Sequence, residues 1–199
     1  MKILHYYSGI MISVFIGFHL LNHLLILRSD GHHIRFMQGL RKIYRNRIME
    51  ILLLLGISIQ IISGITLVIL KWNKIESYFD VMQIASGLYM SFFLTVHINA
   101  VLIGRYKLKV DTNLYYGAGV MNMWPHKIFF IPYYSLSILS FFFHVACIHR
   151  TKMSEFVSTS SATAQSFIIM GIGIVITSLI IYKMSRLNFS KEKFTVKSY

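Results

Sequence analysis

The fold of this chain is decided by residues 3–27, ILHYYSGIMISVFIGFHLLNHLLIL, which contain no Asp, Glu, Lys or Arg. Roughly 20 apolar residues at about 1.5 Å rise cross the hydrocarbon of a bilayer as an α-helix. Four more stretches of the 199 residues lack formal charge: Ile51–Leu70, Val81–Gly104, Ile128–Ile148 and Phe156–Tyr182. A helix satisfies its own backbone hydrogen bonds, as lipid requires. The sequence predicts an all-α integral membrane bundle of five transmembrane helices.

We expect one membrane domain over residues 1–199, with spans at about 3–27, 51–70, 81–104, 128–148 and 165–183. The connections are too short for a soluble catalytic domain. The single cysteine, Cys147, excludes a disulfide within the chain and an iron–sulfur cluster held by this chain alone. The first span is longer than the apolar core of a secretory signal, so we expect it to be retained.

The net charge of +13 is distributed unevenly along the chain. Connections 28–47 and 105–127 and the tail from Lys183 together carry fifteen Lys and Arg, whereas the opposite ends of the spans carry five. Basic connections favour the cytoplasmic side and bind anionic lipid headgroups. The charge pattern predicts an inner-membrane protein with its amino terminus outside and its carboxyl terminus in the cytoplasm, and it favours lipid over nucleic acid as the partner.

Two of the connections between the spans have sequence patterns that predict their structure. Residues 31–47, GHHIRFMQGLRKIYRNR, place apolar side chains at helical spacing between basic ones: Ile34, Met37, Leu40 and Ile43 or Tyr44. This pattern predicts an amphipathic interfacial helix at about 33–46. In residues 113–127, NLYYGAGVMNMWPHK, the glycines and Pro125 predict an irregular loop.

Two intramembrane histidines lie at matching depth. His19 is eight residues from the cytoplasmic end of its span and His97 is seven from the same end of another, about 10–12 Å below the surface. Ionisable groups at such depth indicate function. Two imidazoles at one level are what the axial positions of a six-coordinate haem require, although an isolated transmembrane histidine is more often a packing or relay residue.

Each histidine continues a stripe along its helix. The first stripe holds Ser8, Ile12, Phe15 and His19, and the second holds Ser86, Met90, Phe93, His97 and Gly104. Small residues in such stripes make room for a flat ligand or serve ordinary bundle packing. Three other histidines are in or near spans: His23 one turn above His19, His5 near the outer end, and His144 in the outer half of the fourth span.

Residues 5–23, HYYSGIMISVFIGFHLLNH, and 97–105, HINAVLIGR, resemble the cytochrome b membrane-anchor subunits of succinate dehydrogenase and fumarate reductase. The five-span plan is similar to the single-chain form of that anchor. The resemblance implies bound haem b, quinone as substrate, flavoprotein and iron–sulfur subunits as partners, and electron transfer rather than a catalytic residue of this chain's own. Anchors of that family usually begin in the cytoplasm, opposite to the orientation that the charges predict.

The resemblance also implies roles for single residues. His19 and His97 correspond to the axial ligands from spans one and three, with His23 as a substitute for His19. His144 corresponds to the span-four ligand of two-haem members, but the second span has no histidine. We therefore expect one haem in a four-helix core with a peripheral fifth helix, and His144 as a quinone contact, a proton relay or a hydrogen-bonded packing residue.

We also expect roles for residues near the ends of the helices that carry His19 and His97. Arg28 and Arg105 would pair with the haem propionates or serve as positive-inside anchors. Ser8 and His5 resemble the quinone-side Ser-Gly region of the family. Glu50 is most simply a carboxylate at a helix N-terminus.

Other classes of membrane protein fit less well. A zinc peptidase needs HExxH and a di-iron hydroxylase needs further histidine boxes such as HxxHH, and the sequence has neither motif. A cofactor-free membrane scaffold or a small transporter is the alternative that the sequence leaves open.

Overall fold

The computed structural model describes residues 1–187, in which five helices are long and apolar enough to cross a membrane. These helices are α1 (Lys2–Leu24), α3 (Arg47–Lys71), α4 (Tyr78–Leu102), α6 (Lys127–Met153) and α7 (Thr159–Met184). Short 3₁₀ turns extend α1 over Leu25–Leu27 and α3 over Trp72–Lys74, and a π turn extends α4 over Ile103–Lys107. The five spans predicted from the sequence are confirmed as helices.

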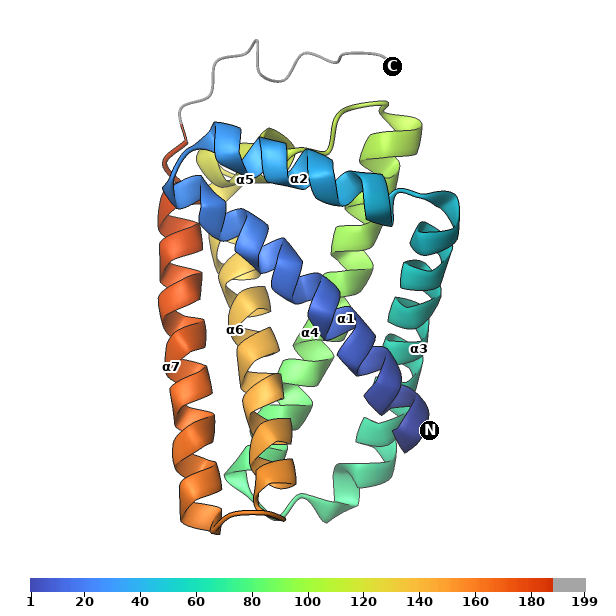
Figure 1. Ribbon diagram of the computed structural model, residues 1–199, viewed down its shortest axis with the longest axis vertical. Helices are drawn as coiled ribbons and strands as arrows, with labels where there is room; N and C mark the ends of the chain where they lie inside the picture. Colours follow the sequence, from blue (N-terminus) through green and yellow to red (C-terminus); the bar gives the residue numbers. More distant parts are fainter. Residues whose placement is uncertain (188–199) are drawn as a thin grey trace.

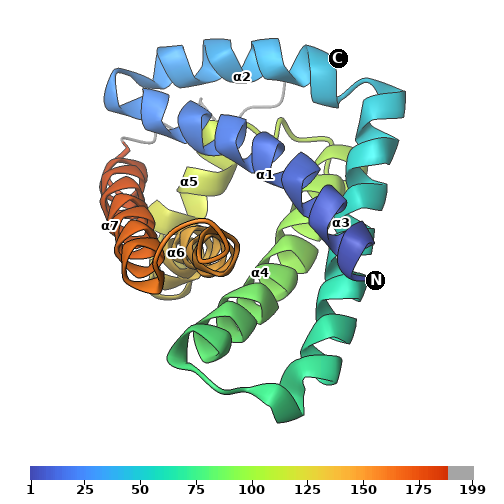
Figure 2. The same cartoon turned by 60° about the horizontal axis from the view of Figure 1, so that its bottom comes forward.

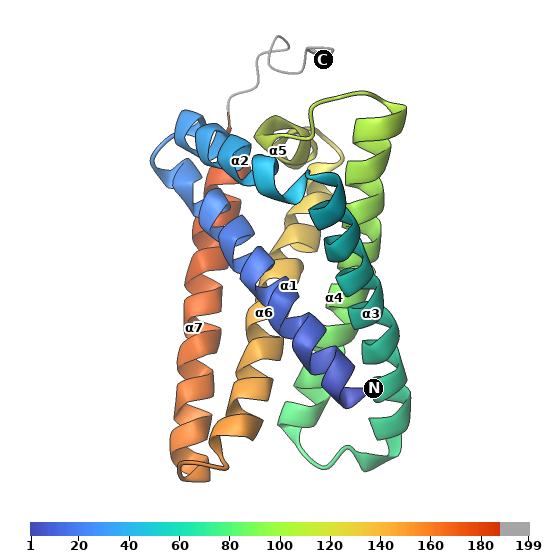
Figure 3. The same cartoon turned by 45° about the vertical axis from the view of Figure 1, so that its right-hand side comes forward.

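The long helices do not all run in the same direction. In Figure 1, α3, α4, α6 and α7 run along the length of the bundle, whereas α1 crosses in front of them diagonally, from α3 toward α7. Figure 3 shows the same crossing from another side. Two shorter helices, α2 (Asp30–Tyr44) and α5 (Leu114–Asn122), lie at the end of the bundle where α1 finishes. We call this the α2 end.

Helix α2 begins at a capped terminus. The Ser29 hydroxyl accepts a hydrogen bond from the backbone N–H of His32 at 3.2 Å, so it satisfies one of the donors that a helix start leaves free. A helix is thus confirmed in the predicted segment, although it begins about three residues earlier than expected, and its place at a membrane interface stays a prediction. Its buried face agrees with the prediction at Met37 but differs elsewhere, because His33 is also buried whereas Ile43 is exposed. Figure 2 shows α2 starting near the end of α1 and diverging from it toward the start of α3.

The prediction of an irregular loop at residues 113–127 is wrong over α5. The Asn113 side chain accepts a hydrogen bond from the N–H of Tyr115 at 2.9 Å and starts the helix. Leu114, Ala118 and Met121 are then buried in the apolar core at the α2 end. Tertiary burial outweighs the low helix propensity of the glycines.

The apolar core at the α2 end joins distant parts of the chain. Its buried members are Leu20, Ile26, Leu114, Ala118, Met121, Ile138, Ile180 and Met184. The expected peripheral helix, α7, lies at the edge of the bundle against α6, yet its last two turns belong to this core. The charges expected in the cytoplasmic tail at Lys191, Lys193 and Lys197 lie outside the described residues.

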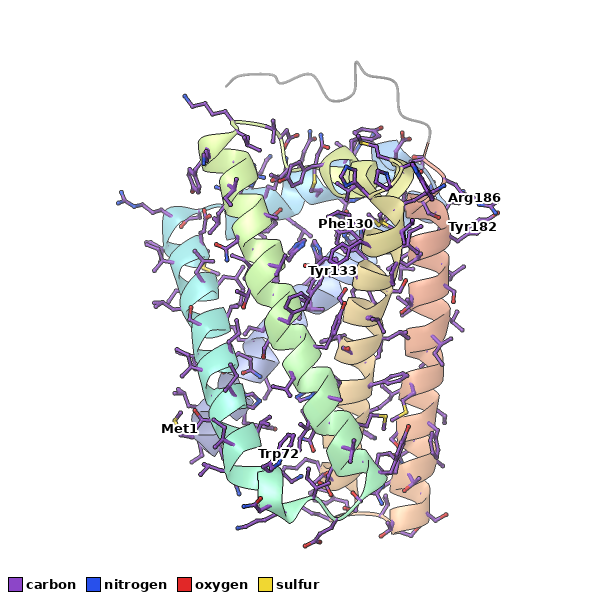
Figure 4. The ribbon with its side chains drawn as sticks, turned by 180° about the vertical axis from the view of Figure 1, so that it is seen from behind. Met1, Trp72, Phe130, Tyr133, Tyr182 and Arg186 are labelled. Atoms are coloured by element: carbon purple, nitrogen blue, oxygen red, sulfur yellow. The ribbon has the colours of Figure 1, made fainter. Side chains whose placement is uncertain are left out.

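The outer surface suits a membrane. Large apolar side chains such as Ile62, Ile69 and Ile168 are more than 60% exposed, which would be unfavourable in water and is expected against lipid tails. Aromatic residues lie near both ends, as in interfacial belts: Figure 4 shows Trp72 at one end and Tyr182 beside Arg186 at the other. The Arg186 Nη1 donates a hydrogen bond to the Tyr182 hydroxyl at 3.1 Å.

Candidate cofactor site

A mostly apolar cavity of about 310 Å³ lies inside the bundle toward the α2 end. Small-molecule sites generally measure about 300–1,000 Å³, so this cavity is at the small end of that range. Its walls come from residues 12–23 of α1, 33–44 of α2, 50–57 of α3, 90–105 of α4 and its π turn, 134–141 of α6 and 180–184 of α7, with the segment 112–117 closing one side. His19, His23, His33 and His97 all border it.

His19 and His97 face each other from α1 and α4. Their ring centroids are 6.3 Å apart, so the depth match predicted from the sequence brings the two imidazoles together. Each ring is backed by a phenylalanine one turn earlier in its helix. Phe15 is stacked with His19 at 6.1 Å, and Phe93 is stacked with His97 at 5.1 Å. These aromatic contacts restrict the rotation of either imidazole ring.

The α4 side of the pair is supported by α6. Tyr133 packs against Phe93 with ring centroids 4.9 Å apart, and the Tyr89 hydroxyl donates a hydrogen bond to the Tyr133 carbonyl at 3.0 Å. Figure 4 shows Tyr133 between α4 and α6. His97 is therefore held by a helix pair that is itself fixed by aromatic packing.

His23 lies beside the pair and shares a contact with it. Its Nε2 is 3.3 Å from the Nε2 of His19, and its Nδ1 is buried without a hydrogen-bond partner among residues 1–187. This geometry agrees with its expected place as a neighbour of His19 on one helix face. It also means that metal binding by His19 would replace the contact with His23.

The fourth histidine of the cavity, His33, was not expected there. It comes from α2, its ring centroid is 5.1 Å from that of His23, and it is 2% exposed. Neither of its ring nitrogens has a partner in the part of the chain that the structure describes. Burial, with smaller contributions from His19 and Arg41 and against the opposing effect of Asp30, lowers the pKa of His33 to about 4. The ring is therefore neutral at pH 7.

The spacing of His19 and His97 fits two imidazoles that would hold one haem iron between them. Two imidazoles on opposite sides of one metal, each with a nitrogen–metal distance of about 2 Å, have ring centroids roughly 6 Å apart. The observed 6.3 Å between His19 and His97 agrees with that spacing. Within residues 1–187 no three His, Cys, Asp or Glu side chains are grouped to hold a bare metal ion. A haem, whose ring supplies four nitrogens, needs only two protein ligands.

Arg28 and Arg105, the two arginines expected to pair with haem propionates, lie in different surroundings. Arg105 borders the cavity and binds Glu50, with Nη1 to Oε1 at 2.7 Å and Nη2 to Oε2 at 3.3 Å. Glu50 is thus the partner of an arginine from another helix and not only a carboxylate at the start of α3. Arg28 is exposed at the end of α1 and does not border the cavity.

A second polar cluster joins α1 to α3 in the half of the bundle away from α2. His5 Nδ1 is 2.9 Å from the Ser63 hydroxyl, and His5 Nε2 is 3.1 Å from the Gln60 side-chain nitrogen. The Ser8 hydroxyl donates a hydrogen bond to Gln60 Oε1 at 2.7 Å. The expected pair of Ser8 and His5 is therefore brought together, and Gln60 and Ser63 complete it.

His144 lies away from the cavity, against α4. Its Nδ1 is 3.0 Å from the Gln83 carbonyl and 3.4 Å from the Ser86 hydroxyl. A methyl group added at Gly87 would come within 3.1 Å of the His144 ring. Of the three roles left open for His144, this geometry is that of a hydrogen-bonded packing residue.

The small residues of the two predicted stripes do not border the cavity. Ser8 and Ser86 belong to the polar contacts just described. Gly104 instead makes room for the segment after α4, because an added Cβ would lie 2.9 Å from the Thr112 methyl group and 3.0 Å from the Tyr116 hydroxyl. None of these three residues therefore makes room for a ligand of the cavity.

Comparison with known proteins gives no relative from which a function could be inferred. No protein-family model matches the chain, and neither the curated proteins nor the solved structures contain a significant match.

Proposed function

We propose that this chain is a haem b-containing membrane anchor that passes electrons between a soluble partner and membrane quinone. The observation that carries the proposal is the pair His19 and His97, which face each other at 6.3 Å across an apolar cavity. The sequence resemblance to succinate dehydrogenase and fumarate reductase anchors supports the same function. When bound, haem supplies an iron that changes reversibly between two oxidation states.

Within this proposal the protein performs three tasks. His19 and His97 would hold the iron, and the stacked Phe15 and Phe93 orient their rings. The apolar walls exclude water, and exclusion of water tunes the potential of a buried metal. The basic α2 end is the surface for soluble flavoprotein and iron–sulfur subunits.

The proposal is tested by the reduced-minus-oxidised visible spectrum of the detergent-purified chain, with haem quantified per polypeptide. We expect a low-spin b-type spectrum near one haem per chain. His97→Ala should abolish it, and His19→Ala should abolish it unless His23 takes the position, in which case the double variant His19→Ala/His23→Ala should be haem-free. His149→Ala is the matched control, because His149 does not border the cavity and its Nε2 lies 2.8 Å from Gln165 Oε1.

Two outcomes would contradict the assignment. A normal spectrum in both His97→Ala and the double variant would show that other residues hold the iron. A well-folded wild-type chain without haem, although haem was supplied during expression, would favour a cofactor-free scaffold or transporter.

The quinone part of the proposal is assigned to Ser8 and His5 with Gln60. Quinone carbonyls accept hydrogen bonds, and these three side chains carry hydroxyl, imidazole and amide donors within one cluster. Ser8→Ala and His5→Ala should slow quinone reduction by the reduced haem without altering the haem spectrum. Unchanged stopped-flow rates in both variants would place the quinone elsewhere.

A further inference from the structure

The charges around the α2 end of the cavity are unequally paired. Arg41 Nη1 binds Asp111 Oδ1 at 2.7 Å, and Arg105 binds Glu50 through two hydrogen bonds. Each of these two guanidinium groups therefore has its own carboxylate. Arg45, at the C-terminal end of α2, makes no ion pair with any residue of the described range 1–187.

The contacts of Arg45 are incomplete. Its Nη2 donates a hydrogen bond to the Thr112 hydroxyl at 3.1 Å, whereas its Nε is buried and has no partner among the described residues. The side chain also borders the cavity. A buried donor without an acceptor is unfavourable, and it is more so when the group is charged.

The surroundings of Arg45 increase this cost. Burial and the neighbouring positive charges of Arg41 and Arg105 lower the pKa of Arg45, against opposing effects of Tyr44 and Asp111. An anion beside the guanidinium would supply the missing acceptor and offset the repulsion.

We propose that Arg45 binds an acidic group of the cavity ligand, so that α2 provides a carboxylate subsite. This inference rests on the proposed function, in which the acidic group is a propionate of haem. It replaces Arg28 as the expected propionate partner and adds a residue from α2 to the site. A guanidinium binds a carboxylate in two parallel hydrogen bonds, which fixes one edge of the ligand relative to α2.

The test compares haem with its dimethyl ester, which has the same ring but no free carboxylates. Both are titrated into the cofactor-free chain, for wild type and for Arg45→Gln, Arg45→Lys and Arg35→Gln. Arg35 is the matched control, because it lies on the exposed side of the same helix. Arg28→Gln is included because Arg28 is the propionate partner expected from the sequence. Thermal unfolding checks that each variant is folded. The comparison of haem with its ester in wild type does not depend on the folding of any variant.

We expect wild type to bind haem roughly tenfold to a hundredfold more tightly than the ester, the range for a buried charge-assisted hydrogen bond. Arg45→Gln should bind haem and ester alike, Arg45→Lys should keep part of the preference, and Arg35→Gln should keep all of it. Haem bound to Arg45→Gln should have a lower midpoint potential, because a nearby positive charge disfavours oxidation of the iron.

The contrary outcomes separate this inference from the proposed function. Equal binding of haem and ester by wild type would overturn the carboxylate subsite and leave the haem assignment intact; it is also the result expected if lipid phosphate occupies Arg45. A preference lost in Arg28→Gln but kept in Arg45→Gln would return the role to Arg28. Failure of wild type to bind either compound would overturn the proposed function and this inference together.

Discussion

His33 occupies an unfavourable position for a polar side chain. It is 2% exposed, and neither ring nitrogen has a hydrogen-bond partner among residues 1–187. A buried polar group in this state costs about 1–3 kcal/mol. Replacing it by an apolar residue of similar size should therefore stabilise the cofactor-free chain, as is common where a protein accepts strain at a binding site.

The corresponding prediction is that His33→Leu raises the free energy of unfolding of the cofactor-free chain by about 1 kcal/mol. Thermal unfolding in detergent measures this. The matched control is His32→Leu, since His32 Nδ1 contacts the Ser29 hydroxyl at 2.7 Å and its loss should not stabilise the chain. Destabilisation by His33→Leu would mean that His33 already has a partner.

The pKa of His33 also predicts a pH dependence. Its pKa in the folded chain is about 4, whereas a free histidine has a pKa near 6.5. Between these values the unfolded chain binds more protons, so stability falls as the pH is lowered from 6.5 toward 4 and this contribution levels off below 4. Unfolding temperatures across this pH range should decline less steeply in His33→Leu than in wild type. Identical slopes would contradict the burial of a neutral His33.

At the scale of elements, α6 and α7 approach closely at Gly173. A Cβ added at Gly173 would lie 2.6 Å from Cγ of Phe142, whereas a Cβ at Gly171 would meet no atom within 4 Å. We expect Gly173→Ala to destabilise the bundle by about 1–3 kcal/mol through overpacking. Gly171→Ala should be neutral or slightly stabilising, because alanine favours the helix. Equal unfolding temperatures for the two variants would show that α7 can shift away from α6.

The five long helices could be predicted from the sequence because length and the absence of charge are local properties. The start of α2 was missed by about three residues because its signal is a single Ser29 cap. Helix α5 was missed for a different reason. Its glycines argue against a helix locally, and only the core formed with α1, α6 and α7 makes the helix favourable. That core depends on contacts between residues far apart in the chain.

The candidate site likewise has a part that local sequence predicts and a part that depends on contacts between distant residues. His19 and His97 could be paired by counting residues, since depth in a membrane is set by helix rise. His33 and Arg45 could not be assigned to the site, because their positions depend on α2 folding back across the bundle. The sequence does carry one signal for His33, namely its spacing with Met37 and Tyr44 on one helical face.

At the scale of the whole molecule, the charge asymmetry predicts orientation. The connection 28–47 and the segment 105–127 lie at the α2 end, and the connection between α3 and α4 lies at the other. Alkaline phosphatase fused after residue 75 should be active outside the cytoplasm, and a fusion after residue 110 should be inactive. A fluorescent-protein fusion at each site is the converse control. The opposite pattern would give the orientation usual for the anchors that the sequence resembles.

The cavity is enclosed by side chains from residue 12 to residue 184. Because a chain is synthesised from its amino terminus, His19 and His33 exist long before the last wall, formed by Ile180 and Met184, has been made. The complete chamber is therefore one of the last parts of the structure that can form, after nearly the whole described chain has been translated.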